Sequence, residues 1–332
     1  MMFETDQKES SGELRIFSAV DKSSLAGMRF RSRILRSLPA QIEISEARKM
    51  LGGHAAVRAN LFRGLEQIAQ EYSINTTFPL PPGQTVGVLA GLRIAADLIK
   101  LKARIRLGPN YCVSPRQDPR IFLAREVEAV LVPSRWVADF YSTELPEISE
   151  KVRVWASGVD CDYWRPQKSV TASRYLVLYV KNSEGALVAR TIQFLESLGL
   201  AYRIVEYGKY RSNAYLGVLQ RSLAVIWLGK SESQGIAQFE AWSVDVPTFV
   251  HYDPTDLEVR LGTNLTPARI SASAWSPSPY LSSQNGSFWD SFEELRALCA
   301  DIFSGVIRYA PRSFVLNGYN LASAAKAYRS LF

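Results

Sequence analysis

Short apolar runs alternate with helical patterns through most of this chain, and the alternation narrows its fold class more than any other feature. Strands of four to six residues that alternate with helices form parallel sheets joined by right-handed crossovers. The alternation occurs twice, which predicts an α/β protein with two doubly wound, Rossmann-like parallel-sheet domains. The expected strands lie at residues 14–17, 85–90, 103–107, 129–132, 175–180, 202–205, 223–228 and 247–250.

Helical patterns fill the stretches between and after these runs. The expected helices lie at residues 55–72, 92–101, 134–141, 186–198, 213–221, 236–244, 288–303 and 321–332. Residues 261–286 are rich in Ser, Pro, Asn and Thr, and this composition predicts a long irregular excursion rather than a regular element.

The alternation is interrupted at residues 152–168, a stretch that contains a glycine, a proline, two aspartates and two tryptophans. We place the domain boundary there, with an N-terminal domain of residues 1–157 and a C-terminal domain of residues 158–332. A chain of 332 residues suits two domains of roughly 150 residues each. The last helix is free to pack back on the N-terminal domain. Two doubly wound domains that face each other leave a cleft lined by the carboxyl ends of their strands.

Composition excludes several classes of protein. No apolar stretch approaches the roughly 20 residues that cross a bilayer, and the polar N-terminus lacks the apolar centre of a signal peptide, so we expect a cytoplasmic protein. The three cysteines are far apart and there are two histidines, which leaves few candidates for a zinc site or a histidine-dependent triad. A net charge of +7 permits an anionic partner, but the basic residues are dispersed, and we expect no nucleic acid.

The segment after the run at 223–228 carries two glutamates, Glu232 and Glu240, with Gly235 between them. A helix that begins near Gly235 presents free backbone N–H groups to the carboxyl edge of the sheet, where they and the helix dipole can hold an anion. Glu240, one turn inside, can accept two adjacent hydroxyls of a ribose. Taken alone, the pair is more simply explained as good helix capping. The expected N–H donors belong to Gln234, Gly235, Ile236 and Ala237.

Three phrases resemble motifs of the retaining glycosyltransferases of the GT-B class, glycosyltransferase family 4 (group 1). Residues 231–250 resemble the family's Glu-x7-Glu motif, including a proline that enters the next strand. Residues 132–141 resemble its P-S-x-W-V helix start, and residues 156–166 its G-V-D-x-x-x-F-x-P interdomain link. They occur in the family's order with similar separations. The resemblance implies the GT-B fold, with an acceptor domain followed by a nucleotide-sugar donor domain.

The resemblance also implies roles for particular residues. Glu232 would contact the hydroxyls of the donor sugar and Glu240 the ribose, while the backbone of residues 234–237 would take the distal phosphate. Lys181 follows the first strand of the second half, where the family carries a basic residue that neutralises the diphosphate. Glu232 and Lys181 are therefore the catalytic candidates, although a lysine at a strand end is also an ordinary surface residue.

Candidates in the first half are less well defined. Gly52 and Gly53 resemble the family's Gly-Gly loop near the donor phosphates and the acceptor, but they fit a flexible joint before a helix equally well. His54 beside them is a candidate for the acceptor side or a residue of the helix face. Asn110 and Ser114 follow a predicted strand, so they are expected to face the cleft and bind acceptor hydroxyls, unless they form a plain turn.

The resemblance implies transfer of a hexose from a nucleotide-diphosphate sugar to a glycan or lipid-linked acceptor, with retention of configuration and without a metal or other cofactor. Asp160 and Asp162 have the spacing of a metal motif but fall in the presumed link. The family's mid-domain histidine and its second basic residue after Lys181 are absent. Two alternatives stay open, a non-hydrolysing sugar-nucleotide epimerase and an inactive nucleotide-sugar-binding relative. The positive charge permits peripheral contact with an anionic membrane on its cytoplasmic face.

Overall fold

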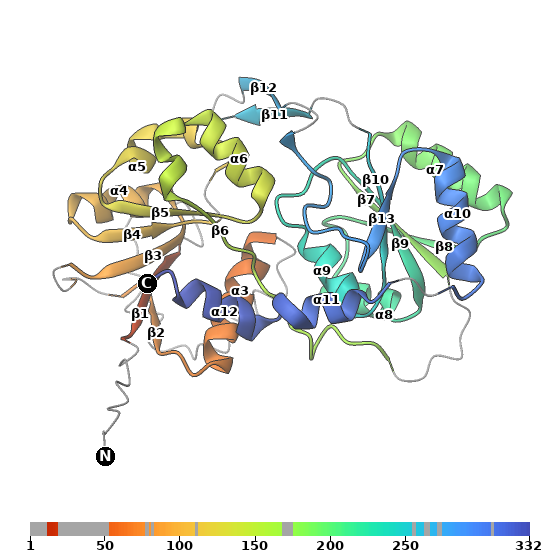
Figure 1. The fold of residues 1–332 in the computed structure, drawn as a ribbon, viewed down its shortest axis with the longest axis horizontal. Coiled ribbons are helices and arrows are strands. Elements are labelled where there is room, and N and C mark those ends of the chain that lie inside the picture. The colour runs from red at the N-terminus through yellow and green to blue at the C-terminus, as the bar shows by residue number, and fades with distance from the viewer. Residues whose placement is uncertain are drawn as a thin grey trace, which may run out of the picture.

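The computed structural model shows two α/β domains, each with a parallel sheet flanked by helices (Figure 1). It describes residues 12–18, 53–76, 80, 83–109, 112–167, 175–253, 257–261, 266–270, 274–306 and 309–332. The prediction of two doubly wound parallel sheets is confirmed. None of the helices in these ranges combines the length and the apolar character needed to cross a membrane.

The N-terminal sheet has six parallel strands in the order β2-β1-β3-β4-β5-β6. Its apolar strands are covered on both faces, as the near-continuous apolar runs predict. The strands are β1 (Leu14–Ser18), β2 (Tyr72–Ile74), β3 (Thr85–Ala90), β4 (Arg104–Leu107), β5 (Val127–Val132) and β6 (Val152–Val154). The helices are α3 (Gly53–Gln67), α4 (Leu92–Lys100), α5 (Pro119–Leu123) and α6 (Arg135–Glu144).

The C-terminal sheet has five parallel strands in the order β13-β10-β9-β7-β8. Successive connections run to opposite sides of β7, so the strand order reverses between β7 and β9. The strands are β7 (Tyr175–Lys181), β8 (Tyr202–Glu206), β9 (Ser222–Gly229), β10 (Thr248–His251) and β13 (Gly286–Trp289). The helices are α7 (Gly185–Ser197), α8 (Ser212–Leu219), α9 (Ile236–Ser243) and α10 (Phe292–Phe303).

Two of the predicted helices were too long. The first ends at Gln67, because the chain turns at Ala69, whose φ is 51°, and then enters β2. The predicted helix at 288–303 begins only at Phe292, where the Ser291 hydroxyl caps it, since strand β13 occupies the preceding residues. The stretch predicted to be irregular also contains β12 (Thr266–Ile270), which pairs antiparallel with β11 (Leu257–Leu261).

The C-terminal segment returns to the N-terminal domain. After α11 (Pro311–Gly318), α12 (Leu321–Arg329) packs against α3 (Figure 1). Gly64 of α3 lies against the Leu321 carbonyl, where a Cβ would not fit, and the Trp155 indole N–H donates to the Ala324 carbonyl at 2.9 Å.

The chain therefore passes between the domains twice, once in the link after β6 and once between α11 and α12. The two passages lie side by side. Val159 forms a parallel bridge with Asn320, and its N–H donates to the Tyr319 carbonyl at 2.9 Å.

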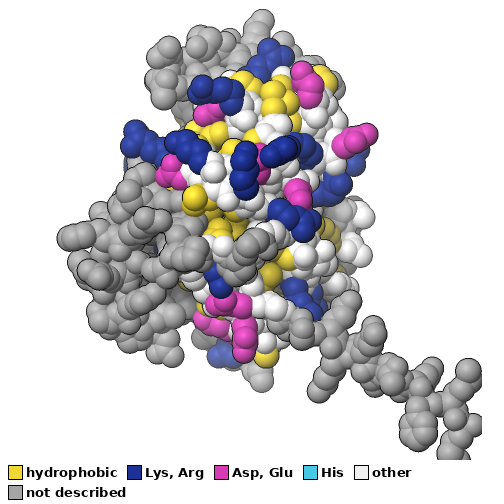
Figure 2. All heavy atoms as spheres, turned by 90° about the vertical axis from the view of Figure 1, so that its left-hand side faces the viewer, with side chains coloured by type: hydrophobic (Ala, Val, Ile, Leu, Met, Phe, Trp, Pro, Cys, Tyr) yellow, Lys and Arg dark blue, Asp and Glu magenta, His cyan; other side chains and the backbone are white. Residues whose placement is uncertain are grey.

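Charged side chains are mixed on the outer face of the N-terminal domain. Figure 2 shows Lys and Arg side chains spread over this face with Asp and Glu between them. Arg104 and Arg106 on β4 both pair with Glu128 of β5, and Lys102 pairs with Glu126 at 3.2 Å. Much of the positive charge of the β4–β5 region is thus balanced locally.

Candidate functional site

The carboxyl ends of β7 and β9 meet at the point where the strand order of the C-terminal sheet reverses. Lys181, the last residue of β7, stands in register with Gly229 of β9, and Glu232 follows three residues later. The Lys181 ammonium lies 2.7 Å from Oε1 and 2.9 Å from Oε2 of Glu232. The two residues predicted to be catalytic thus form one ion pair where doubly wound sheets hold ligands.

This ion pair is shielded from water. Glu232 is 6% exposed, and its burial raises the pKa of the carboxyl, although the adjacent Lys181 charge opposes the rise. The ammonium also lies 4.5 Å from the centre of the Tyr207 ring, a cation–π contact from the segment after β8. Lys181 and Glu232 are each other's counterion inside the protein. A ligand that binds one of these charges must therefore also provide a partner for the other.

The start of α9 presents free backbone donors beside this pair. Gly235 caps the helix in the left-handed conformation, with φ 88° and ψ 53°, and a Cβ there would overlap the Gln238 carboxamide. The first N–H groups bonded to the Gly235 carbonyl are those of Gln238 and Phe239. Within the described ranges, the N–H groups of residues 234–237 have no acceptor, and together with the helix dipole they form an anion site.

The side chain of Gln234 has a different task from its backbone. Its carboxamide oxygen accepts from the Ser157 N–H at 3.0 Å, and its NH2 group donates to the Ser157 carbonyl at 2.6 Å. The buried Gln238 donates to the Pro277 carbonyl at 3.1 Å and accepts from the Ser278 hydroxyl at 2.9 Å. These carboxamides fix the helix start against the link and against the segment after the β11–β12 hairpin. Neither Gln238 nor Ser157 was predicted from the sequence as a site residue.

Glu240 lies one turn inside α9, on the side of a tyrosine cluster. It is half-buried, and burial raises the pKa of its carboxyl to about 8. Within the described ranges no side chain pairs with it. Burial and then the charge of Glu240 raise the pKa of Tyr210, whose hydroxyl lies 2.7 Å from that of Tyr179. Tyr179 in turn stacks on Trp227 with ring centres 4.1 Å apart. Glu240 is therefore a carboxyl next to aromatic rings and without a partner among the residues that the structure describes.

The three phrases singled out in the sequence meet at this site. The indole N–H of Trp136, in the phrase at 132–141, donates to the Glu232 carbonyl at 2.8 Å. Ser157, in the phrase at 156–166, is the residue that pairs with the Gln234 side chain. A further bond runs from the Tyr280 hydroxyl to the Pro133 carbonyl at 2.7 Å. The loop between β9 and α9 is thus held from both the N-terminal domain and the link.

The aspartates with metal-motif spacing have a structural role. Asp160 is 3% exposed and pairs with Arg63 of α3, and its Oδ1 also accepts from the N–H groups of Asp162 and Tyr163. Asn60 of α3 donates to the Gly158 carbonyl at 2.7 Å. In the part of the chain that the structure describes, no group of three His, Cys, Asp or Glu side chains could hold a metal ion.

The candidate residues of the first half of the chain do not all lie at the site. Gly53 opens α3, and His54 follows it on the first turn. Burial and then the charge of Lys181 lower the pKa of His54, so this side chain lies near the ion pair. Ser114, in contrast, is fully buried. Its hydroxyl accepts from the Arg116 N–H and donates to Glu144 at 3.0 Å, which leaves no surface for an acceptor. Gly52 and Asn110 lie outside the described residues.

Neither a protein-family model nor a curated protein matches the sequence. Solved structures do match, over nearly the whole chain. A glycosyltransferase from Rickettsia africae ESF-5 has a TM-score of 0.52 at 11% identity, over 96% of this chain and 97% of its own. The lipopolysaccharide outer core galactosyltransferase WaaB has a TM-score of 0.53 at 9% identity, over 96% and 98%.

Alr3699/HepE from Anabaena, solved in complex with UDP and glucose, has a TM-score of 0.52 at 10% identity, over 96% of this chain and 99% of its own. At such identities the similarity extends to the fold. It includes both domains and their parallel sheets. The chain has the GT-B fold of these glycosyltransferases.

Proposed function

We propose that this protein is a glycosyltransferase that takes a hexose from a nucleotide-diphosphate donor, which binds between the start of α9 and the end of β7. One observation carries the proposal: free N–H groups, the Lys181–Glu232 ion pair and the unpaired Glu240 lie together where the strand order of the sheet reverses. A diphosphate needs cationic and N–H groups, and a sugar and a ribose need carboxylates. The complex of HepE with UDP and glucose supports a donor of this class.

The proposed donor pose divides the site into three parts. The N–H groups of residues 234–237 and the Lys181 ammonium take the diphosphate, whose negative charge grows as the anomeric C–O bond breaks. Glu232, released from Lys181, accepts hydroxyls of the sugar. Glu240 takes the ribose diol. With its pKa near 8, this carboxyl is mostly protonated at pH 7 and can both donate and accept a hydrogen bond.

The proposed reaction transfers the sugar to an acceptor hydroxyl with retention of configuration. The bond from the anomeric carbon to the diphosphate oxygen breaks, a bond to the acceptor oxygen forms, and the proton of the acceptor hydroxyl passes to the departing diphosphate. His54 lies near Lys181 at the start of α3, and its lowered pKa leaves the imidazole neutral at pH 7. A neutral imidazole can accept a hydrogen bond from the acceptor hydroxyl. We propose a glycan or a lipid-linked glycan as acceptor, and catalysis that uses no metal.

Calorimetric titration of the chain with UDP, GDP and their hexose conjugates tests the donor site. We expect at least one diphosphate to bind, and Glu240→Ala to weaken that binding tenfold or more. Glu293→Ala, which removes an exposed glutamate from the first turn of α10, should leave binding unchanged. Failure of every diphosphate to bind contradicts the donor site. Binding without transfer or hydrolysis of any donor contradicts the enzyme and leaves a binding protein.

A further inference from the structure

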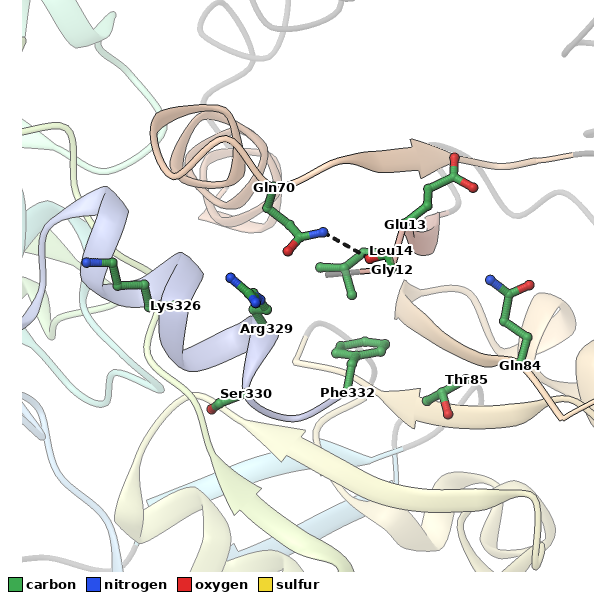
Figure 3. A pocket seen from close by; sticks show the side chains of 10 residues that line it. All are labelled: Gly12, Glu13, Leu14, Gln70, Gln84, Thr85, Lys326, Arg329, Ser330 and Phe332. Atoms are coloured by element: carbon green, nitrogen blue, oxygen red, sulfur yellow. Dashed lines mark hydrogen bonds between the residues drawn. The ribbon is translucent and has the colours of Figure 1, made fainter. Parts of the chain in front are cut away.

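A cavity lies far from the ion pair, at the amino ends of strands in the N-terminal sheet. It is partly open to solvent and has a volume of about 870 Å³ between the amino ends of β1 and β3 and the last turn of α12 (Figure 3). The proposed donor site lies at the carboxyl ends of β7 and β9, in the other domain. The two sites share no residue, so a ligand of this cavity is a second ligand.

One end of the cavity is cationic. Lys326 and Arg329 stand in the last turn of α12 and are exposed. Within the described ranges, neither side chain forms an ion pair. Figure 3 shows the Arg329 side chain directed toward the part of the cavity where Gln70 lies, while the Lys326 side chain points away from the other lining residues. A guanidinium with no carboxylate partner at a cavity wall is suited to a carboxylate or phosphate, which it can bind with two parallel bonds.

The lining also contains the carboxylate of Glu13, which pairs with Arg15 at 3.5 Å, and two carboxamides. Gln70 is 4% exposed, and its NH2 group donates to the Gly12 carbonyl at 3.1 Å and to the Glu71 carbonyl at 2.8 Å. Its carboxamide oxygen is buried without a partner, and so is that of Gln84 on the opposite side. Both oxygens are covered by protein atoms, so a ligand can donate to them only after the carboxamide turns toward the cavity, a change that relieves the cost of an unpaired buried acceptor.

An apolar surface lies between the two ends. Figure 3 shows the Phe332 ring in the middle of the lining, close to Leu14 and between Arg329 and Gln84. A sugar ring presents C–H groups on its face and hydroxyls around its edge, which matches an aromatic surface with carboxamide groups at its margin. A carboxylate or phosphate on that sugar would meet Arg329.

We propose that this cavity binds an acidic sugar, a saccharide unit that carries a carboxylate or a phosphate. The juxtaposition that carries the inference is a guanidinium with no ion pair to any described residue, an aromatic ring, and two carboxamides whose covered oxygens have no hydrogen-bond partner, all lining one cavity. The proposal is independent of the donor site, since none of these residues belongs to it.

Titration of the full chain with sodium glucuronate, glucose 6-phosphate and glucose tests the proposal by ligand-observed NMR or calorimetry. We expect glucuronate or glucose 6-phosphate to bind and glucose to bind at least tenfold more weakly. Arg329→Gln should weaken the acidic sugars tenfold or more, and Gln84→Leu should weaken them and glucose alike. The two acidic sugars distinguish a carboxylate-bearing ligand from a phosphate-bearing one.

Two controls locate the binding. Lys100→Gln removes a basic residue from the last turn of α4, as Arg329→Gln does from α12, and should change nothing. Glu232→Ala alters the ion pair of the other site and should also leave acidic-sugar binding unchanged. The proposal is overturned if neither acidic sugar binds at a concentration of about 20 mM, which would detect millimolar affinity. It is also overturned if Arg329→Gln binds the acidic sugars as tightly as the unaltered chain does, or if glutamate binds and the acidic sugars do not.

Discussion

The indole N–H of Trp136 donates to the backbone carbonyl of Glu232 at 2.8 Å, so a residue of the N-terminal domain holds the loop that carries the buried carboxylate of the C-terminal domain. Within the proposed function, this bond sets the distance between the ion pair and whatever the N-terminal domain binds. Trp136 does not have to touch the donor to affect transfer, because it acts through the position of Glu232.

Trp136→Phe removes the N–H donor and keeps an aromatic ring. A hydrogen bond of this kind contributes about 0.5–1.5 kcal/mol, so we expect kcat to fall by about three- to tenfold while KM for the donor changes less. Steady-state kinetics with varied donor measure both constants. Tyr280→Phe removes another interdomain bond, the one to the Pro133 carbonyl, and leaves the bond to Glu232 in place. Equal loss of kcat in both variants would mean that interdomain packing, rather than the position of Glu232, matters.

Lys181→Met leaves the Glu232 carboxylate buried without its counterion. Breaking a buried pair from one side costs about 3 kcal/mol in the free energy of unfolding, and Glu232→Gln in the same chain should restore most of it. Urea unfolding of the two single variants and the double variant measures the coupling. In Lys181→Met the pKa of Glu232 rises further above its unfolded value, so stability should fall as the pH rises above 5. Strict additivity of the two substitutions contradicts the pairing.

Glu240 predicts a pH dependence of stability. Its folded pKa of about 8 lies above the ordinary 4.5, so its favourable contribution is complete below pH 4.5 and is lost as the pH rises toward 8. Glu240→Gln removes this titration, so the variant should gain stability relative to the unaltered chain, by at most about 1.4 kcal/mol per pH unit in that window. Urea midpoints from pH 5 to 9 provide the measurement. A constant difference between the two chains across that range would place the pKa near its ordinary value.

Gly235 predicts a substitution that affects folding and anion binding together. Its φ of 88° is unfavourable for alanine, and a Cβ would overlap the Gln238 carboxamide. We expect Gly235→Ala to lower stability by about 1–3 kcal/mol and to weaken diphosphate binding. Thermal unfolding and calorimetry measure the two effects. Gly217→Ala in α8 is the control, since no atom lies within 4 Å of its added Cβ, and it should be neutral or stabilising. If Gly235→Ala is as stable as the unaltered chain, the helix start does not require glycine at this position.

The sequence predicted the long apolar strands closely, because a buried parallel strand is apolar on both faces. The runs at 85–90 and 223–228 became β3 and β9 within one residue at each end. Strands β2, β6 and β13 were not predicted, because three or four residues are too few to show a periodic pattern of apolar side chains. Their places are set by neighbouring strands in the sheet, which no local pattern records.

Individual residues of the candidate site could be predicted from the sequence, but the contacts between pairs of residues could not. Glu232 and Lys181 were identified separately, but their mutual ion pair depends on the register of β7 against β9. Likewise, the bond of Gln234 to Ser157 joins residues 77 positions apart. Ser114 has the residue type that binds acceptor hydroxyls, yet its hydroxyl caps a short helix and bonds Glu144. Residue type predicts what a side chain can do, and the fold decides which partner it meets.

The return of α12 means that the core of the N-terminal half is completed by a helix from the C-terminal segment of the chain. Ala325 and Tyr328 of α12 are buried in the same core as Leu61 and Leu65 of α3. A fragment that stops at the link would expose that apolar surface and is expected to aggregate when expressed alone. Supplied as a second polypeptide, the remainder of the chain carries the missing helix, so the two pieces are expected to be soluble only when they are produced together.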